Sequence, residues 1–335
     1  MTDKRDIYGR LVCLLLGMGI YGLWGTPTPD DPGWPEWLIG TLLVLAARPW
    51  RALSALFFRE RRQRLWQSAS GLLFFYGLSV PMLMGFLGGN TPVLMMRDLL
   101  PFLFFLMPLF FIDVTGRNRR YADFYLYAVL CVGFLLAARV VAPVLVGAVS
   151  PAKGVDPFYL ANAPTVLFAA LFLLGGAGTR LYVSLRLGSI VQASVFFALA
   201  LVPLYAMILV TQRATLGLTA AALLMWMVLA FLRAPRRAIA PALFLAVGLV
   251  ALWPFLEEAL AALMTKTALV GFNMRIQEMV AVMDTLSDSP VTLLFGKGWG
   301  ATYSSPAVAD LTVNFTHSLL TTYWLKTGLV GLLLA

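Results

Sequence analysis

The stretch that decides the fold runs from residue 189 to residue 232 and reads SIVQASVFFALALVPLYAMILVTQRATLGLTAAALLMWMVLAFL. Its only charged residue is Arg213, which separates an apolar run at 189–211 from a second run at 214–232. A helix needs about 20 apolar residues to cross the hydrocarbon core of a bilayer, and each run has close to that length. The stretch therefore predicts two transmembrane helices joined by a short turn.

The rest of the chain has the same character. Hydrophobic residues make up 60% of the 335 residues and charged residues 12%, and the mean hydropathy is +0.84. Ordinary soluble domains are about half apolar and about a quarter charged. Further apolar runs occur at approximately 11–25, 36–48, 66–87, 98–114, 122–149, 157–178, 238–255 and 316–335. We therefore predict an all-α polytopic membrane protein with about ten transmembrane helices, in a single domain that covers residues 1–335.

Two of these runs leave an alternative open. The run at 36–48 is short, and the run at 122–149 is long and contains Arg139, so a re-entrant or tilted segment is an alternative to a simple crossing. The final run reaches Ala335 without a polar exit, from which we expect the natural protein to continue. No small-residue cleavage site follows the first run, so we expect the N-terminal helix to be retained.

The distribution of basic residues predicts which side of the membrane each connection faces. Lys and Arg near helix ends are retained on the cytoplasmic side, and we therefore place the N-terminus there. The cytoplasmic connections then hold all of the 25 Lys and Arg residues except Arg97, Arg139, Lys153, Arg213, Lys266, Arg275, Lys297 and Lys326. The net charge of +9 forms no continuous basic stripe, which argues against a nucleic-acid partner.

One long connection, residues 255–315, is predicted to lie on the outer side of the membrane. Its first half, residues 255–286, is compatible with an amphipathic helix that lies on the membrane surface or over the helical bundle. The apolar residues at helical spacing in this half are Ile276, Met279, Val280, Met283 and Leu286. The sequence Ser287-Asp-Ser-Pro290 then predicts the end of that helix.

No sequence pattern for a cofactor is present. Phe295-Gly-Lys-Gly-Trp-Gly300 is rich in glycine, but it lacks the strand and the Ser/Thr of a phosphate-binding loop, so we predict a flexible turn. The sequence contains neither a His/Cys cluster nor a dinucleotide-binding glycine pattern. Cys13 and Cys131 lie inside apolar runs, and we assign them no role. We therefore expect neither a metal nor an organic cofactor.

Three residues are the main candidates for chemistry. His317, the only histidine, stands where the outer connection re-enters the membrane, as a general base or as a helix cap. Arg213, at a membrane boundary, binds a ligand or snorkels to lipid headgroups. Arg275 belongs to the same site or to a solvated helix face. Because guanidinium groups bind phosphate oxygens, a lipid diphosphate is the natural substrate for outward-facing arginines.

Weaker candidates for binding the diphosphate or the glycan are Gln212, Arg139, Arg97 and Ser318. Arg139 is placed to reach the outer interface, and Arg97 to pair with Asp98 or with lipid. We expect Lys326 to pair inside the helical bundle and to take no direct part in catalysis.

The C-terminal part of the chain, roughly residues 200–335, resembles the O-antigen ligase superfamily. The most specific feature is His317-Ser318, followed by nine residues and then Gly328-Leu-Val-Gly331. A large outer loop that contains Arg275 and Leu294-Phe-Gly-Lys-Gly-Trp-Gly300 precedes it, and Arg213 matches an arginine near the outer end of a mid-chain helix. The family's Arg-x-x-x-Leu pattern is altered here, because Met279 stands at the fourth position after Arg275.

This resemblance implies a GT-C type membrane glycosyltransferase that needs no metal. It would take a glycan from undecaprenyl diphosphate and join it to an acceptor hydroxyl of lipid A-core in lipopolysaccharide biosynthesis. The implied site faces the periplasm from the bacterial inner membrane. Arg213 and Arg275 would hold the diphosphate leaving group, and His317 would orient or deprotonate the acceptor.

Three other functions stay open. A polysaccharide polymerase and a protein O-oligosaccharyltransferase of the same superfamily would use a similar site with a different acceptor. A transporter of lipid-linked glycans would also use outward arginines, but it would be expected to show broken helices in paired halves, and no such duplication is evident.

Overall fold

The computed structural model describes residues 4–26, 33–48, 65–106, 111, 118–148, 156–251, 253, 257, 260–261, 264–265 and 274–335. By their internal contacts, the residues group into two compact units. Unit 1 comprises Met1–Ala46 and Arg117–Thr265, and unit 2 comprises Ala47–Gly116 and Lys266–Ala335. Each unit is thus built from two stretches that are distant in the sequence.

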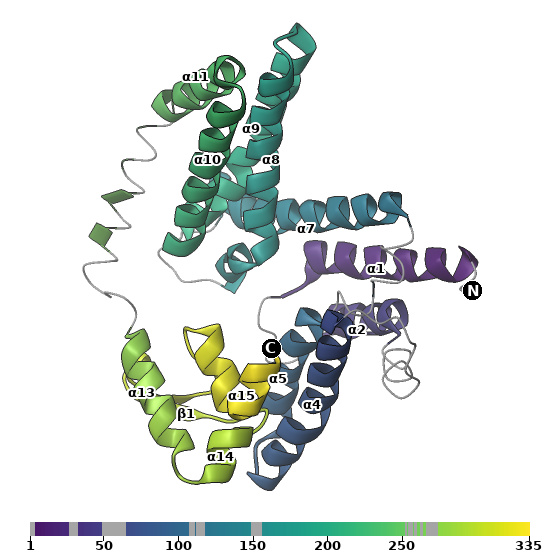
Figure 1. Ribbon diagram of the computed structural model, residues 1–335, viewed down its shortest axis with the longest axis vertical. Helices are drawn as coiled ribbons and strands as arrows, with labels where there is room; N and C mark the ends of the chain where they lie inside the picture. Colours follow the sequence, from purple (N-terminus) through teal and green to yellow (C-terminus); the bar gives the residue numbers. More distant parts are fainter. Residues whose placement is uncertain are drawn as a thin grey trace. The chain divides into compact units, whose positions relative to one another are not determined.

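Unit 1 is helical throughout its described residues. Its elements are α1 (Lys4–Trp24), α2 (Trp34–Ala47), α7 (Arg119–Leu145), the 3-10 helix η2 (Asp156–Asn162), α8 (Pro164–Val183), α9 (Leu187–Leu209), α10 (Arg213–Arg233) and α11 (Pro235–Ala251). Short turns join α8, α9, α10 and α11, which pack side by side (Figure 1).

Helices α1 and α7 run in parallel, as two contacts show. The rings of Tyr8 and Tyr121, near the two helix starts, lie 6.1 Å apart. Near the two helix ends, Arg139 Nη1 donates to the carbonyl oxygens of Gly22 at 3.2 Å and Gly25 at 3.0 Å. The pair crosses the α8–α11 layer (Figure 1). At the crossing, a Cβ on Gly133 of α7 would come within 2.0 Å of the Thr165 carbonyl oxygen, so only glycine permits this approach.

Six helices in the described part of the chain are long and apolar enough to cross a membrane, namely α1, α4, α7, α8, α9 and α10. The predicted helical membrane character is therefore confirmed, whereas the predicted ten crossings are not. The remaining apolar runs fall on shorter helices, such as α2 with 14 residues and α15 with 16. A 14-residue helix is about 21 Å long, which is less than the roughly 30 Å thickness of the hydrocarbon core.

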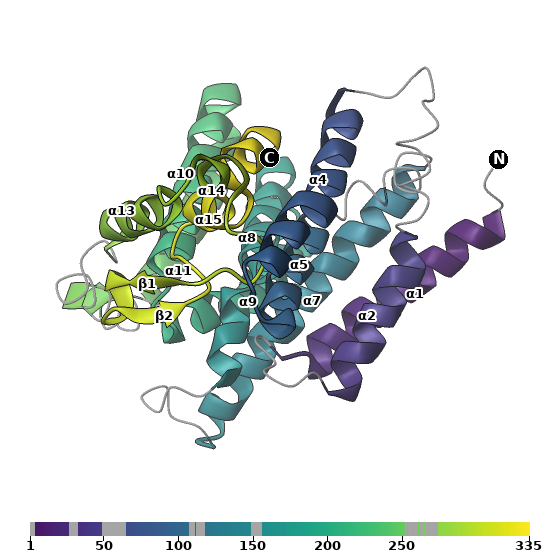
Figure 2. The same ribbon diagram turned by 90° about the horizontal axis from the view of Figure 1, so that it is seen from below.

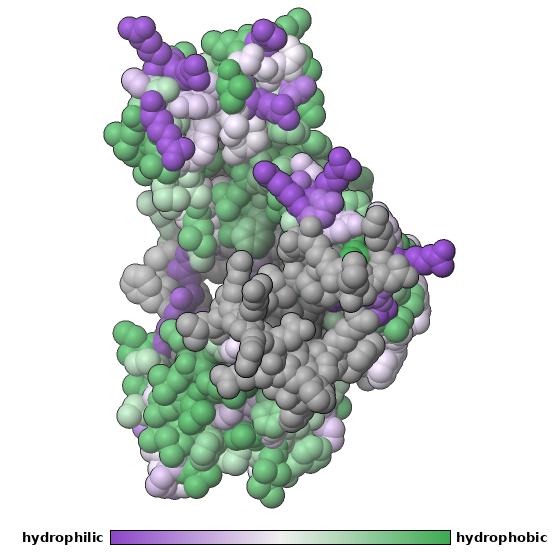
Figure 3. Space-filling model, turned by 45° about the vertical axis from the view of Figure 1, so that its right-hand side comes forward, coloured by the Kyte–Doolittle hydropathy of each residue, from purple (hydrophilic) through white to green (hydrophobic). Residues whose placement is uncertain are grey.

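Charge is distributed unequally between the two ends of the α8–α11 layer. Exposed arginines occupy the end where α8 meets α9 and α10 meets α11, and they are Arg180, Arg186, Arg233, Arg236 and Arg237. Hydrophilic side chains gather there, above apolar flanks (Figure 3). Arg213 lies at the opposite end of α10. This asymmetry is the one that the positive-inside rule uses to orient helices.

Unit 2 combines helices with a small hairpin. Its elements are α4 (Leu65–Leu87), α5 (Pro92–Phe105), α13 (Arg275–Leu286), α14 (Pro290–Phe295), β1 (Tyr303–Ser305), the 3-10 helix η3 (Pro306–Val308), β2 (Leu311–Val313) and α15 (Leu319–Leu334). Strands β1 and β2 pair antiparallel, with Tyr303 opposite Val313, and both are seen in Figure 2.

Helix α13 ends where the sequence predicts, and most of its apolar face is exposed. Its last residue is Leu286, and Ser289 and Thr292 form a capping box that starts α14. The buried positions of α13 are Glu278, Val282 and Leu286. Of the predicted apolar positions, Leu286 alone is buried, and Ile276, Met279, Val280 and Met283 are exposed. Most of the preceding half of the predicted helix lies outside the described residues.

The glycine-rich segment after α14 is a packed element, not the flexible turn that the sequence predicts. Helix α15 is interrupted at Gly328, whose φ of 65° suits glycine alone. The interruption frees carbonyl groups of the preceding turn. The backbone N–H of Lys297 donates to the Leu325 carbonyl at 2.9 Å, and that of Gly298 donates to the Lys326 carbonyl at 3.1 Å.

Further contacts hold this segment against α4 and α15. A Cβ on Gly328 would lie 2.3 Å from the Leu294 carbonyl oxygen, and a Cβ on Gly296 would lie 2.5 Å from the Lys326 carbonyl carbon. The hydroxyl of Tyr76 donates to the Thr327 carbonyl at 2.7 Å, and the indole N–H of Trp299 donates to the Gly77 carbonyl at 2.7 Å. Glycine is therefore needed here for close packing, and the segment fixes the position of α15.

Candidate functional site

His317 stands in the short connection between β2 and α15. The residue after it, Ser318, is the N-cap of α15 and makes no side-chain capping bond. The first turn is instead held by the Thr316 hydroxyl, which donates to the Ser318 carbonyl at 2.7 Å and lies 2.9 Å from the Thr322 hydroxyl. His317 is thus not the cap of α15, and a separate hydrogen-bond network fixes the backbone beside it.

The imidazole of His317 is paired with a buried carboxylate. His317 Nδ1 lies 3.0 Å from Glu278 Oε1, and the His317 backbone N–H donates to Glu278 Oε2 at 3.0 Å. Glu278 belongs to the buried face of α13 and is 1% exposed. Side chain and backbone of the histidine are therefore both anchored on one carboxylate.

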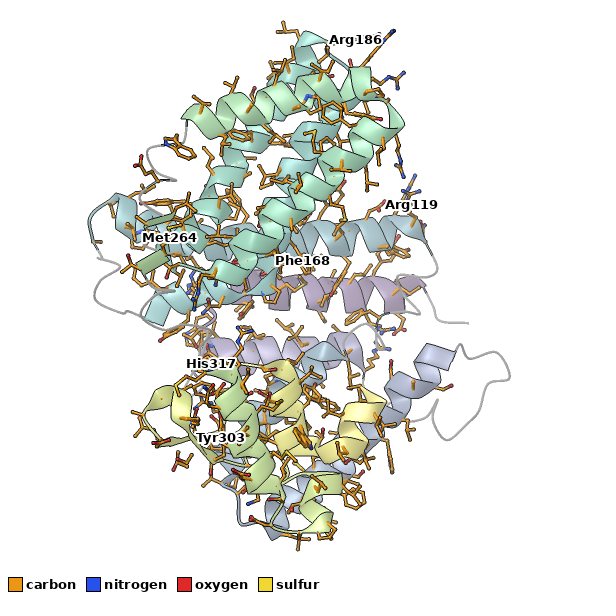
Figure 4. All side chains as sticks on the ribbon, turned by 60° about the vertical axis from the view of Figure 1, so that its left-hand side comes forward. Arg119, Phe168, Arg186, Met264, Tyr303 and His317 are labelled. Carbon is orange, nitrogen blue, oxygen red and sulfur yellow. The ribbon has the colours of Figure 1, made fainter. Side chains whose placement is uncertain are left out.

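Two further donors complete the surroundings of Glu278. The Tyr303 hydroxyl donates to Oε1 at 2.8 Å, and the Ser305 hydroxyl donates to the same oxygen at 2.9 Å. Both residues come from β1, and His317 and Tyr303 both lie beside α13 (Figure 4). The carboxylate therefore receives hydrogen bonds from the hairpin and from the segment that leads into α15.

The ionised form of Glu278 prevails in spite of its burial. Desolvation raises the pKa of this carboxyl, but the hydrogen bonds from His317, Tyr303 and Ser305 outweigh it, so the pKa is lowered below the ordinary value. Desolvation is also the main reason why the pKa of Tyr303 is raised to about 12, and the bond to Glu278 adds to the rise. Tyr303 therefore stays a hydrogen-bond donor at neutral pH.

This pairing selects one form of the imidazole ring. An ionised carboxylate only accepts hydrogen bonds, so Nδ1 of His317 must carry a proton. In the neutral ring the lone pair is then on Nε2, which makes no hydrogen bond within the described residues. The side chain of His317 is 32% exposed. The histidine is thus held by one nitrogen and offers the other as a base, which is the arrangement of a general-base pair.

Arg275 and Arg213 occupy the same kind of position in separate units. Arg275 is the first residue of α13, one turn before Glu278, and it is exposed. Arg213 is the first residue of α10 in unit 1 and is half-buried. The N-terminus of a helix carries a partial positive charge, so a cation there is unfavourable unless an anion is bound nearby. Both arginines thus mark helix starts suited to an anionic ligand.

The weaker candidates take structural contacts. Gln212 is the N-cap residue of α10; its amide donates to Asn162 Oδ1, and its Oε1 accepts from the Thr215 hydroxyl at 2.7 Å. Arg139 binds carbonyl groups at the end of α1, where a cation is favourable. These contacts give both residues a role in local structure.

Lys326 is paired inside unit 2, as predicted. Its Nζ lies 2.6 Å from Asp98 Oδ2 and donates to the Ala301 carbonyl at 2.5 Å, and the side chain is 1% exposed. Asp98 Oδ2 also accepts from the backbone N–H of Gly300 at 2.6 Å. Arg97, which the sequence places to pair with Asp98 or with lipid, also interacts electrostatically with Asp98. The Asp98–Lys326 pair ties α5, the glycine-rich segment and α15 together.

The sequence-based prediction missed Glu278 and Tyr303. One signal was available for Glu278, which lies three residues after Arg275 and interrupts a largely apolar helix. A carboxylate one helical turn from a candidate arginine indicates a site residue as well as the histidine does. Tyr303 has no comparable signal, because its role depends on the hairpin.

Comparisons with protein-family models, with curated proteins and with solved structures return no match. In the part of the chain that the structure describes, no group of three or more His, Cys, Asp and Glu side chains is placed to hold a metal ion. The chemistry of the site therefore has to be argued from its own residues.

Proposed function

We propose that this chain is a metal-independent membrane glycosyltransferase of the O-antigen ligase kind. It transfers a glycan from undecaprenyl diphosphate to an acceptor hydroxyl, with lipid A-core as the leading acceptor. The proposal includes a GT-C type arrangement in the bacterial inner membrane, a cytoplasmic N-terminus and a site that faces the periplasm. The observation that carries it is the Glu278–His317 pair, at the histidine that the sequence resemblance singles out.

The reaction assigns one task to each group of residues. His317 Nε2 accepts the proton of the acceptor hydroxyl, and Glu278 stabilises the imidazolium that forms. The acceptor oxygen attacks the anomeric carbon of the glycan while the bond from that carbon to the diphosphate oxygen breaks. The diphosphate leaves with the bonding electrons, and Arg275 and Arg213 neutralise its growing charge.

The arginines support a diphosphate donor over a neutral one. A guanidinium group is charged at all relevant pH values and binds phosphate oxygens through two parallel N–H bonds. Lysine lacks this planar geometry. We therefore expect Arg213→Lys and Arg275→Lys to raise the KM for the lipid diphosphate, and Arg236→Lys, at an exposed position among the basic residues of unit 1, to leave it unchanged.

The decisive experiment is deletion of the gene followed by analysis of surface glycans. Loss of a ligase leaves bare lipid A-core, with long glycan retained on the carrier lipid. Loss of a polymerase leaves core that carries a single repeat, and loss of a protein oligosaccharyltransferase changes glycoproteins only. Unchanged glycans in all three fractions would refute the proposed function.

A further inference from the structure

An apolar groove lies between α7, α8, α9 and α10 of unit 1. It has a volume of about 590 Å³, within the range of pockets that hold drug-sized ligands. Its wall is formed mainly by Phe172, Gly175, Gly176, Phe196 and Trp226. The two glycines leave α8 without side chains there, and a Cβ on Gly175 would meet no atom within 4 Å. The groove is therefore open space along an apolar helix surface.

One end of the groove is polar and basic. Thr179 and Arg180 lie in the last turn of α8, Ser184 follows that helix, and Ser189 lies in the first turn of α9. Arg180 is exposed, and its guanidinium forms no hydrogen bond or ion pair with any residue that the structure describes. The lining thus changes from hydrocarbon to hydroxyl and guanidinium groups along its length.

We infer that this groove binds one anionic phospholipid. An acyl chain would lie against Gly175 and Phe196, and the phosphate would meet Arg180 and the hydroxyl groups of Ser184 and Ser189. The apolar wall matches the chain, and the charge of Arg180 matches the headgroup. This site is independent of the proposed function, because its residues belong neither to α13 nor to the segment that carries His317.

Fluorescence of Trp226 tests this inference at the site itself. The full-length protein is reconstituted in phosphatidylcholine vesicles that contain brominated phosphatidylglycerol or, as the comparison, brominated phosphatidylcholine. The contribution of Trp226 is the difference in quenching between the wild-type protein and Trp226→Phe. We expect brominated phosphatidylglycerol to quench this contribution at a lower mole fraction than brominated phosphatidylcholine.

Three variants distinguish lipid binding in the groove from general electrostatic attraction to an anionic membrane. Arg180→Gln should weaken phosphatidylglycerol binding about fivefold, the effect of one basic residue near an anionic headgroup. Gly175→Leu, which fills the groove without a clash, should abolish the quenching. Arg186→Gln, at the same end of unit 1 but outside the groove, should leave it within about twofold.

Two results would overturn the inference. An equal loss in Arg186→Gln and Arg180→Gln would show that only the general positive potential attracts the lipid. Persistent quenching in Gly175→Leu would show that lipid does not enter the groove. Thermal unfolding of each variant in detergent establishes that it is folded, and the Arg180→Gln and Arg186→Gln comparison is decisive even where Gly175→Leu is unstable.

Discussion

Among the pairs of a carboxylate with a basic side chain in unit 2, the Glu278–His317 pair and the Asp98–Lys326 pair differ in access to the surroundings. Glu278 and His317 lie 3.0 Å apart, and the histidine side chain is 32% exposed. Asp98 and Lys326 lie 2.6 Å apart, and the lysine side chain is 1% exposed. Both basic partners come from α15 or from the residues immediately before it. Similar chemistry therefore serves two purposes within one unit.

Access to the surroundings, and not charge, distinguishes the Glu278–His317 pair from the Asp98–Lys326 pair. The ammonium group of Lys326 donates hydrogen bonds to Asp98 and to the Ala301 carbonyl, and its burial keeps it out of reach of a substrate. The imidazole of His317 uses one nitrogen and keeps the other available. Exchanging protons with a substrate requires such an unused atom, whereas tying elements together requires that every donor be satisfied.

The largest effect is expected when the buried Asp98–Lys326 pair is broken. Lys326→Met leaves the Asp98 carboxylate buried without its cation, and it should destabilise the protein by about 3–5 kcal/mol. Chemical denaturation in detergent measures this loss. The double variant Asp98→Asn with Lys326→Met is the matched control, because it removes both charges and should recover part of the stability. A single variant as stable as the wild type would contradict the structural role.

Removal of the His317 imidazole should have a larger effect on activity than on stability. His317→Ala deletes the proposed base and should lower kcat by about 10²–10⁴-fold, while the free energy of unfolding falls by about 1–3 kcal/mol because the buried Glu278 carboxylate loses one donor. Transfer from lipid diphosphate to acceptor measures the rate. Ser304→Ala, an exposed position in the neighbouring strand, serves as the control and should retain full activity. Full activity of His317→Ala would refute the mechanism.

Replacement of the carboxylate should have an intermediate effect. Glu278→Gln keeps the size of the side chain and an acceptor for Tyr303 and Ser305, but it removes the charge that stabilises the imidazolium. We expect kcat to fall roughly 10- to 100-fold with KM nearly unchanged. Tyr303→Phe removes one donor to the same oxygen and should cost less. An equal loss in both variants would indicate that Glu278 acts only in folding.

The smallest effect concerns pH. The pKa of Glu278 is lowered in the folded protein, so its stabilising contribution is complete above the ordinary value of 4.5 and is lost as pH falls through the lowered pKa. The stability difference between wild type and Glu278→Gln should therefore shrink as the pH falls below the ordinary value of 4.5. Unfolding measured from pH 7 to pH 3 tests this. A stability difference between the two proteins that increases as the pH is lowered would contradict this prediction.

The sequence predicted the parts of the fold that depend on local patterns. Hydrophobic runs located the helices, and Ser287 to Pro290 located the end of α13. The face that α13 buries could not be predicted, because Glu278 finds partners on β1 and before α15, and no local pattern reveals them. The glycine-rich segment was misjudged for a similar reason, since its backbone groups bond to α4 and α15. His317 and Arg275 were predicted as site residues, but the carboxylate that orients the histidine required tertiary contacts.

The two stretches of unit 2 are separated in the chain by Arg117–Thr265 of unit 1, and this order has a consequence for biosynthesis. Asp98 emerges from the ribosome about 230 residues before Lys326, which at ~5–20 residues per second is roughly 10 to 50 s. During that interval α5 carries an acidic residue whose final partner has not been made. The α4–α5 hairpin therefore cannot complete its contacts with the glycine-rich segment and α15 until the end of the chain has been synthesised.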